Sequence, residues 1–299
     1  MQYGFSIKRK CYLLSVLLMT VWLTGCVQEE FESTPSPAGN GIRFTLTVPD
    51  VNLPSVSSRT MTGTGTAKKE DEIETVDILV FDMSKTPAVF LEWVSATGVT
   101  QDLADNSTVS FSAVLSPTTA STCIVVVANK ELDGIVSGFT KGVTTKVRAM
   151  EEMLHTQTGK WLADGSTTGG YTRIPMYGEK VISKITPSMN PITDINMKRM
   201  LARIDIRNNS VTSNFTVEEV YLANYNTTGY IAPAWNTNGQ VTDPVPDTPV
   251  LPAGSGKMTE EGDAILYSVN GNTPYDGEIY TFESLAAEDA GGAGADGEA

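Results

Sequence analysis

A strict alternation of apolar and polar residues near the N-terminus is the feature that most constrains the fold. Within residues 41–48, the apolar positions are Ile42, Phe44, Leu46 and Val48. Polar side chains stand between them. A period of two that uses β-branched and aromatic residues predicts a β-strand with one buried face. Such a strand needs a second apolar layer to cover that face, so the pattern favours a sandwich over an isolated sheet.

Short apolar runs separated by turn-rich stretches continue along the chain and indicate an all-β fold. Residues 76–81 are almost continuously apolar, which is typical of a central strand covered on both faces. Further extended segments are predicted at 89–94, 109–115, 123–128, 174–179, 195–207, 215–224 and 278–282. A helix is predicted around 145–155, because apolar residues recur there at i, i+3 and i+7. This pattern is typical of antiparallel sandwiches.

The N-terminus has the organisation of an export signal. Basic residues 8–10 precede an apolar run of about 13 residues, whereas a membrane-spanning helix needs about 20. The run ends in Leu23-Thr24-Gly25-Cys26, which resembles a bacterial lipobox. We therefore expect residues 1–25 to be a cleaved lipoprotein signal and Cys26 to carry the lipid, including palmitate. The alternative is an ordinary secretory signal in which Cys26 is incidental.

The residues after Cys26 point to a surface destination. Glu29, Glu30 and Glu32 form an acidic cluster similar to those associated with transfer of Bacteroidota lipoproteins to the outer face of the outer membrane. Residues 26–40, with two prolines and a glycine near their end, are also predicted to be a flexible tether. The two interpretations are compatible.

Charge and cysteine content exclude several classes of function. The formal net charge is −14, and removing the signal takes away three positive charges to give −17. Such a surface repels nucleic acid and anionic lipid headgroups. Of the three cysteines, only Cys123 would keep a free thiol, so no intramolecular disulfide is expected. Its apolar surroundings in the sequence predict a buried, inert thiol.

No motif for catalysis or metal binding is recognisable. The chain contains no phosphate-binding glycine loop, no nucleophile elbow and no paired histidines, and His155 is its only histidine. No spacing singles out a pair of catalytic carboxylates. We expect neither enzymatic activity nor a cofactor. Trp235, Tyr225 and Tyr230 could form a sugar-stacking platform, or they could be core and loop aromatics.

Several motifs, taken in order, resemble one family. A lipobox, an alternating first strand and an arginine-containing linker precede four short motifs. These are residues 77–82 (DILVFD), 125–129 (VVVAN), 174–179 (IPMYGE) and 199–206 (RMLARIDI). Together they resemble the fimbrillin (type V pilin) family of Bacteroidota, which includes shaft, anchor and tip subunits. The resemblance covers about residues 20–230.

This resemblance implies two transthyretin-like antiparallel β-sandwich domains in tandem. The first would span 41–188, with a detachable first strand at 41–49 and a protease-sensitive linker at 50–71. The second would span 189–285, followed by an acidic tail at 286–299 that we expect to be disordered. Family members continue beyond a residue like Phe282 into further strands, so we expect the second domain to be incomplete.

The resemblance also implies a mode of assembly. An arginine-specific protease would cut after Arg59 and remove the strand that carries Ile42, Phe44, Leu46 and Val48. The groove left behind would accept a strand from another pilin subunit, which is a form of β-augmentation. A lipidated pilus anchor would instead stay uncut. The alternative function is a surface glycan-binding lipoprotein of an outer-membrane uptake system.

Overall fold

The computed structural model describes residues 42–47, 71–101, 108–161, 172–187, 189–204, 219–241, 250–253, 264–268 and 279–284. The chain divides into two compact units, residues 1–39 and 40–299, and every described residue belongs to the second unit. Cys26, Val48 and Arg59 lie outside the described residues. In the described part of the chain, no helix has the length and apolar character needed to cross a membrane.

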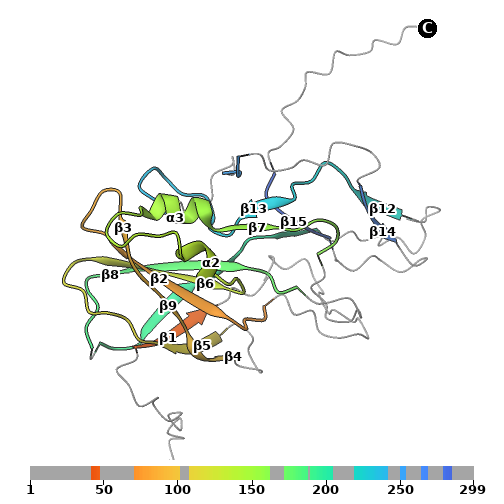
Figure 1. Cartoon of the computed structure of the whole chain (residues 1–299). Helices are drawn as coiled ribbons and strands as arrows, with labels where there is room; N and C mark the ends of the chain where they lie inside the picture. The colour runs from red at the N-terminus through yellow and green to blue at the C-terminus, as the bar shows by residue number, and fades with distance from the viewer. Residues whose placement is uncertain are drawn as a thin grey trace, which may run out of the picture. The chain divides into compact units, whose positions relative to one another are not determined.

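The described residues form an all-β structure with two short helices (Figure 1), which confirms the predicted fold class. The strands are β1 (Ile42–Thr47), β2 (Val76–Asp82), β3 (Val89–Ser95), β4 (Thr97–Gln101), β5 (Thr108–Ala113), β6 (Thr122–Ala128), β7 (Leu154–Thr156), β8 (Met176–Ile182), β9 (Ile192–Asn196), β10 (Lys198–Arg199), β11 (Ala202–Ile204), β12 (Glu219–Leu222), β13 (Thr228–Tyr230), β14 (Ile265–Ser268) and β15 (Ile279–Thr281). The helices are α2 (Asp133–Val136) and α3 (Lys146–Glu152).

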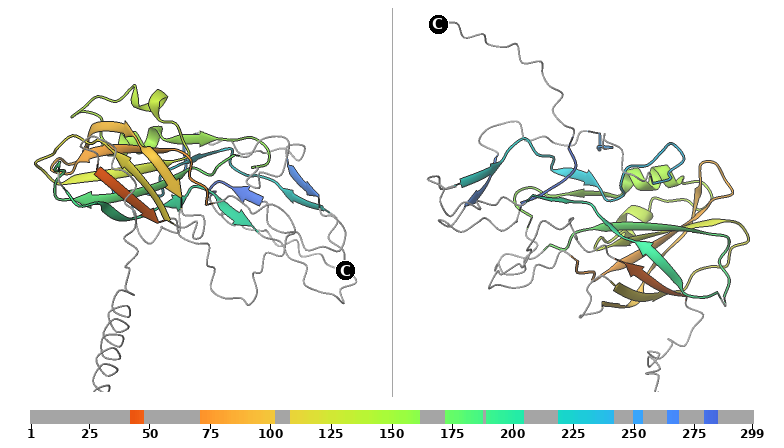
Figure 2. Two further views of the ribbon diagram at one scale, coloured as in Figure 1. Left: turned by 90° about the horizontal axis from the view of Figure 1, so that it is seen from below. Right: turned by 180° about the vertical axis from the view of Figure 1, so that it is seen from behind.

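Two main sheets form a sandwich. One is antiparallel throughout, with the strand order β10-β8-β6-β2-β3. The other has the order β4-β5-β1-β9, and Figure 2 shows β1, in orange-red, alongside β5 in that sheet. Side chains from both sheets meet in one buried core, to which β1 contributes Phe44 and Leu46, and β2 contributes Ile78 and Val80. The apolar faces of β1 and β5 therefore point into this core.

The five-stranded sheet is covered on its second face as well. Leu79, Phe81 and Val125 belong to a separate core cluster that also contains Met150 of α3 and Phe282. Burial on both faces explains why β2 and β6 are almost continuously apolar, and it confirms the central strand predicted at 76–81.

The prediction of one continuous strand at 195–207 is wrong, because this segment contains residues of three short strands, β9, β10 and β11. The chain passes from β9 in one main sheet to β10 in the other and then to β11, which pairs with β15. The change of sheet occurs at Met197, which is fully buried between the sheets. A Cβ on Gly178 would lie 2.7 Å from the Met197 sulfur, so glycine permits this close approach.

The predicted helix at 145–155 is shorter than expected. Helix α3 begins after Thr145, whose side chain accepts a hydrogen bond from the Arg148 N–H, and it ends at Glu152. His155 therefore does not end a helix but lies in β7, opposite Gly229 of β13. The i, i+3, i+7 pattern had included Leu154, which is a strand residue.

The segment beyond residue 188 contributes to both main sheets. Strands β9 and β10 lie at the edges of the two sheets, and β11, β12 and β13 form two-stranded sheets with β15, β14 and β7. The boundary between a first domain at 41–188 and a second at 189–285 stays a prediction.

Candidate functional site

Strand β1 occupies the gap between β5 and β9. It is antiparallel to β5, with Ile42 opposite Ala113, Phe44 opposite Phe111 and Leu46 opposite Val109. It is parallel to β9, where Phe44 pairs with Ile192 and Leu46 pairs with Ile195. Because β1 is hydrogen-bonded on both sides, its loss would leave backbone N–H and C=O groups of both neighbours without partners.

The inward face of β1 is fully packed. Ile42, Phe44 and Leu46 are only 4%, 1% and 0% exposed, whereas Arg43 is exposed and Thr45 is half-buried. The alternation predicted for these residues is confirmed, and Val48 is outside the described part. Burial of each large apolar side chain is worth roughly 1.5–3 kcal/mol, so β1 would not leave an intact chain unaided.

A cluster of polar contacts fixes residues 71–74, which lie just before β2. Arg199 pairs with Asp71, and Arg173 reaches Glu72 at 3.4 Å and Glu74 at 2.7 Å. The Asn129 side-chain amide donates to the Glu72 carbonyl at 2.8 Å. These contacts hold residues 71–74 through groups that do not belong to β1.

Residues of β5 and β9 that pack against β1 were not singled out from the sequence. Phe111 stacks on Phe44, with ring centroids 5.0 Å apart and an angle of 8° between the ring planes. On the other side, Ile192 and Ile195 are 4% and 0% exposed. The signal for Phe111 is the alternation of Val109, Phe111 and Ala113, which matches that of β1. No local signal identifies β9 as a neighbour of β1, because that pairing joins distant segments.

The aromatic residues considered for sugar binding do not form a platform. Tyr225 is only 6% exposed and packs with Ile265 and Ile279. Tyr230 and Trp235 meet edge to face, with centroids 4.9 Å apart and an interplanar angle of 76°. A sugar ring stacks on exposed rings that share a plane, so this arrangement gives no support to a glycan site.

Lys146, Tyr177 and Glu179 form a polar cluster that joins a helix to a strand. Lys146 donates to Glu179 at 2.6 Å, and the Tyr177 hydroxyl donates to the same carboxylate at 2.5 Å. These contacts link α3 to β8. Burial raises the pKa of Cys123 to about 12, so its thiol stays protonated and unreactive at neutral pH.

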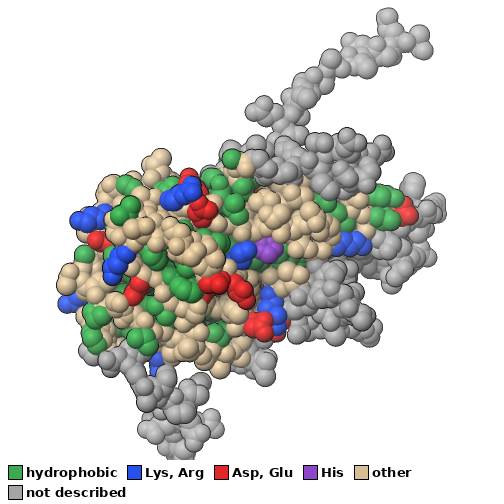
Figure 3. Space-filling view, in the orientation of Figure 1, with side chains coloured by type: hydrophobic (Ala, Val, Ile, Leu, Met, Phe, Trp, Pro, Cys, Tyr) green, Lys and Arg blue, Asp and Glu red, His purple; other side chains and the backbone are tan. Residues whose placement is uncertain are grey.

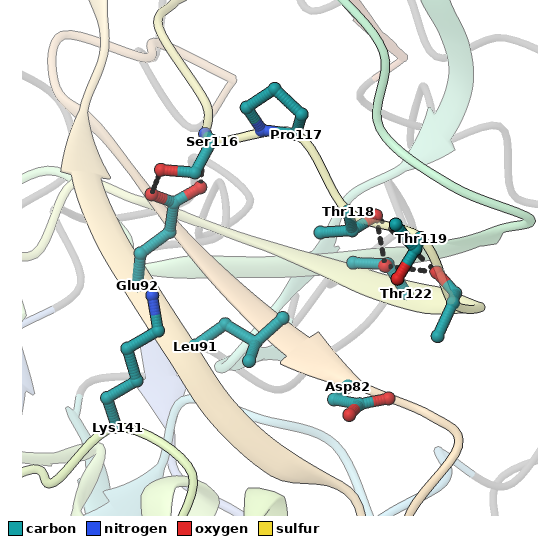
Figure 4. Close-up of a pocket in the computed structure, with 10 residues that line it drawn as sticks. Asp82, Leu91, Glu92, Ser116, Pro117, Thr118, Thr119, Thr122 and Lys141 are labelled. Carbon is teal, nitrogen blue, oxygen red and sulfur yellow. Dashed lines mark hydrogen bonds between the residues drawn. The ribbon is translucent and has the colours of Figure 1, made fainter.

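The described surface has mixed charge and a small pocket lined partly by polar side chains. Basic and acidic side chains are interspersed on the face shown in Figure 3. A pocket of about 240 Å³ is lined by Glu92, Ser116, Thr118 and Lys141 among others (Figure 4). Its Glu92 carboxylate already accepts hydrogen bonds from the N–H and hydroxyl of Ser116. Among the described residues, no group of three potential ligands could hold a metal ion.

Comparison with known proteins gives a family. The family model described as major fimbrial subunit protein (FimA) matches residues 42–245. No curated protein matches the chain. The chain is also similar to two solved structures from Parabacteroides distasonis ATCC 8503. One is a fimbrial assembly protein, 10% identical, with a TM-score of 0.40 and coverage of 83% of this chain and 78% of that one. The other is a candidate cell adhesion protein, 16% identical, with a TM-score of 0.46 and coverage of 84% and 73%.

The two structural similarities are too distant to support an argument, but the family match covers more than half of the 299 residues. It begins at the first residue of β1 and continues through both main sheets. The chain therefore belongs to the major fimbrial subunit (FimA) family.

Proposed function

We propose that this fimbrial subunit is exported as an outer-membrane lipoprotein and polymerises by strand exchange. Cys26 would carry the lipid during export. An arginine-specific protease would then cut after Arg59, and β1 would leave with the lipid. The groove between β5 and β9 would accept a strand from another subunit. The subunit would have no catalytic role.

The position of β1 is the observation that carries this proposal. It fills a gap between two strands, buries three apolar side chains and joins the rest of the fold through a segment that contains Arg59. A cut in that segment would convert loss of β1 from an unfolding step into a dissociation. The groups left unpaired would match those of an incoming strand.

The contacts around Asp71 and Glu72 support the same proposal. Arg173, Arg199 and Asn129 hold the chain just before β2, so a cut at Arg59 would release β1 without loosening β2. An uncut chain would keep β1 and Cys26 and would serve as the lipidated anchor.

A disulfide lock tests the proposal. Arg43 and Ser112 are register partners on β1 and β5, and antiparallel partners lie at Cα separations that a disulfide can bridge. Arg43→Cys with Ser112→Cys should hold β1 in place after cleavage and block pilus assembly until a reductant is added. The buried Cys123 should not interfere.

The matched control joins two strands that stay together. Thr97 and Ser112 are register partners on β4 and β5, so Thr97→Cys with Ser112→Cys adds a comparable disulfide without trapping β1. Assembly should proceed with this pair. Normal pilus assembly by the oxidised Arg43–Ser112 pair would contradict strand exchange.

A further inference from the structure

The groove that holds β1 has two fixed features, the Phe111 ring on one wall and an irregularity in β9 on the other. We propose that these features select the incoming strand. The groove takes a strand from a second copy in one register only, with an aromatic side chain against Phe111. The strand runs antiparallel to β5 and parallel to β9. This inference rests on the proposed function and adds the rule by which the partner strand is chosen.

The aromatic requirement follows from the centre of the groove. Phe44 is 1% exposed and Phe111 3% exposed, and their rings are stacked nearly parallel at 5.0 Å. The two rings therefore overlap in an offset stack, and each covers part of the other's face. An aliphatic side chain in the position of Phe44 would cover less of the Phe111 ring, and a packed interior does not tolerate such a gap without loss of stability.

The register requirement combines the aromatic position opposite Phe111 with the irregular backbone of β9. Between Phe44 and Leu46, β1 advances by two residues while β9 advances by three, from Ile192 to Ile195. This is a β-bulge, in which the backbone of one strand no longer matches its neighbour residue for residue. A strand shifted by one residue would turn its apolar face outward. A strand shifted by two residues would keep that face and its hydrogen-bonding pattern, but it would move the aromatic side chain away from Phe111.

Local contacts hold the bulge in place. Asp194 has a φ of +59°, a conformation that side-chain-bearing residues adopt rarely. The Thr193 hydroxyl donates to the Asp194 carboxylate at 2.8 Å, and the Lys180 ammonium of β8 donates to the Thr193 carbonyl at 2.5 Å. None of these contacts involves β1, so the bulge would remain when β1 leaves.

The two ends of the groove complete the pattern. Ala113 faces Ile42 at one end, and Val109 and Ile195 face Leu46 at the other. The occupant should therefore carry aliphatic, aromatic and aliphatic side chains at alternate positions. Within this chain, residues 265–269 (Ile-Leu-Tyr-Ser-Val) have that order, and β14 within them pairs with β12 in a two-stranded sheet. They supply a natural probe sequence.

Competition during refolding tests the selection rule. The protein is residues 27–299, which leaves out the predicted signal and Cys26, with a specific protease site inserted after Arg59. After cleavage it is unfolded in urea and refolded by dilution with an excess of two competing peptides. Native mass spectrometry then counts which peptide is bound. The reference is peptide 41–48, and its competitors are peptide 264–270, the Phe44→Leu peptide and a peptide with Ile42→Phe and Phe44→Ile.

The proposal predicts a clear order. Peptide 264–270 should compete with the reference. The Phe44→Leu peptide should lose by roughly two- to twelvefold, the range that one aromatic pair contributes. The peptide with the displaced phenylalanine should lose at least as much. Phe111→Leu in the protein should abolish the preference for phenylalanine. Phe90→Leu should preserve it, because Phe90 is also buried but belongs to the other core.

The outcomes separate the two proposals. If all peptides bind equally to the unmodified protein, the groove accepts strands without selection and only this inference is overturned. If the refolded protein binds none of them and retains no β1 fragment, the groove is not an acceptor and the proposed function fails as well.

Discussion

Phe44 of β1 and Phe111 of β5 stack with nearly parallel rings across the strand pair, with centroids 5.0 Å apart and an interplanar angle of 8°. The two rings come from strands separated by about sixty residues of sequence, yet they form the centre of one buried layer. This contact makes β1 an integral part of the sandwich before any cleavage. The stability of the intact subunit should therefore depend strongly on β1.

Truncating Phe44 should destabilise the uncut protein. We expect Phe44→Ala to lower the free energy of unfolding by about 3–5 kcal/mol, because it removes a buried aromatic side chain and leaves a cavity. The neighbouring Thr45→Ala is the control, since Thr45 faces outward and should cost about 0.5 kcal/mol or less. Urea denaturation measures both. Equal effects of the two substitutions would mean that β1 is not seated in the groove in solution.

The bulge in β9 should tolerate glycine and reject a branched residue. Asp194 has a positive φ, which glycine adopts without strain, so Asp194→Val should be less stable than Asp194→Gly by about 1–3 kcal/mol although both lose the Thr193 hydrogen bond. Thermal unfolding of the two variants provides the comparison. A valine variant as stable as the glycine variant would show that the bulge is not maintained.

His155 should make the protein sensitive to mild acid. Burial, with a smaller contribution from Lys130, lowers the pKa of His155 to about 4 from its ordinary value near 6.5. Neither ring nitrogen has a hydrogen-bond partner among the described residues, and the ring lies against Trp161 and Phe282. The unfolded chain therefore takes up a proton below about pH 6.5, whereas the folded chain does so only near pH 4.

The sign of the effect follows directly. The contribution of His155 to stability should be fully present above pH 6.5 and should be lost as the pH falls from 6.5 to 4. Urea midpoints measured across this range should fall more steeply for the wild type than for His155→Phe, which keeps an aromatic ring without a titrating group. Parallel curves would contradict this assignment.

Lipid attachment at Cys26 is tested separately from strand exchange. Cys26→Ala should abolish fatty-acid labelling and leave the precursor unprocessed, because the lipobox peptidase acts only after the cysteine is modified. Labelling with a radioactive or clickable fatty acid, followed by gel electrophoresis, gives the result. Normal processing and membrane retention of the variant would rule out the lipoprotein signal.

Much of the fold was predictable because its signals are local. The alternation of residues 42–46 and the continuous apolar run at 76–81 each reflect how many faces of a strand are covered. The all-β class and the buried face of β1 follow from these two patterns, and both were confirmed.

The missed features depend on long-range contacts. The parallel pairing of β1 with β9 joins residues about 150 positions apart, and no local pattern encodes it. The segment 195–207 was predicted to be one long strand, but the chain changes sheets at Met197. A buried methionine is compatible with a continuous strand and with a crossing between sheets, so the sequence pattern does not distinguish the two. Leu154 extended the helical pattern by coincidence, although its partner is Tyr230 in β13.

The N-terminus of the subunit in assembled pili tests the central claim most directly. Pili are isolated from cells that express wild-type protein or Arg59→Ala, and the N-terminal peptide is identified by mass spectrometry. Wild-type subunits should begin at Thr60, and the Arg59→Ala protein should remain lipidated at Cys26 and unpolymerised. If wild-type subunits in assembled pili still begin at lipidated Cys26, β1 has not been removed and strand exchange in this groove is wrong.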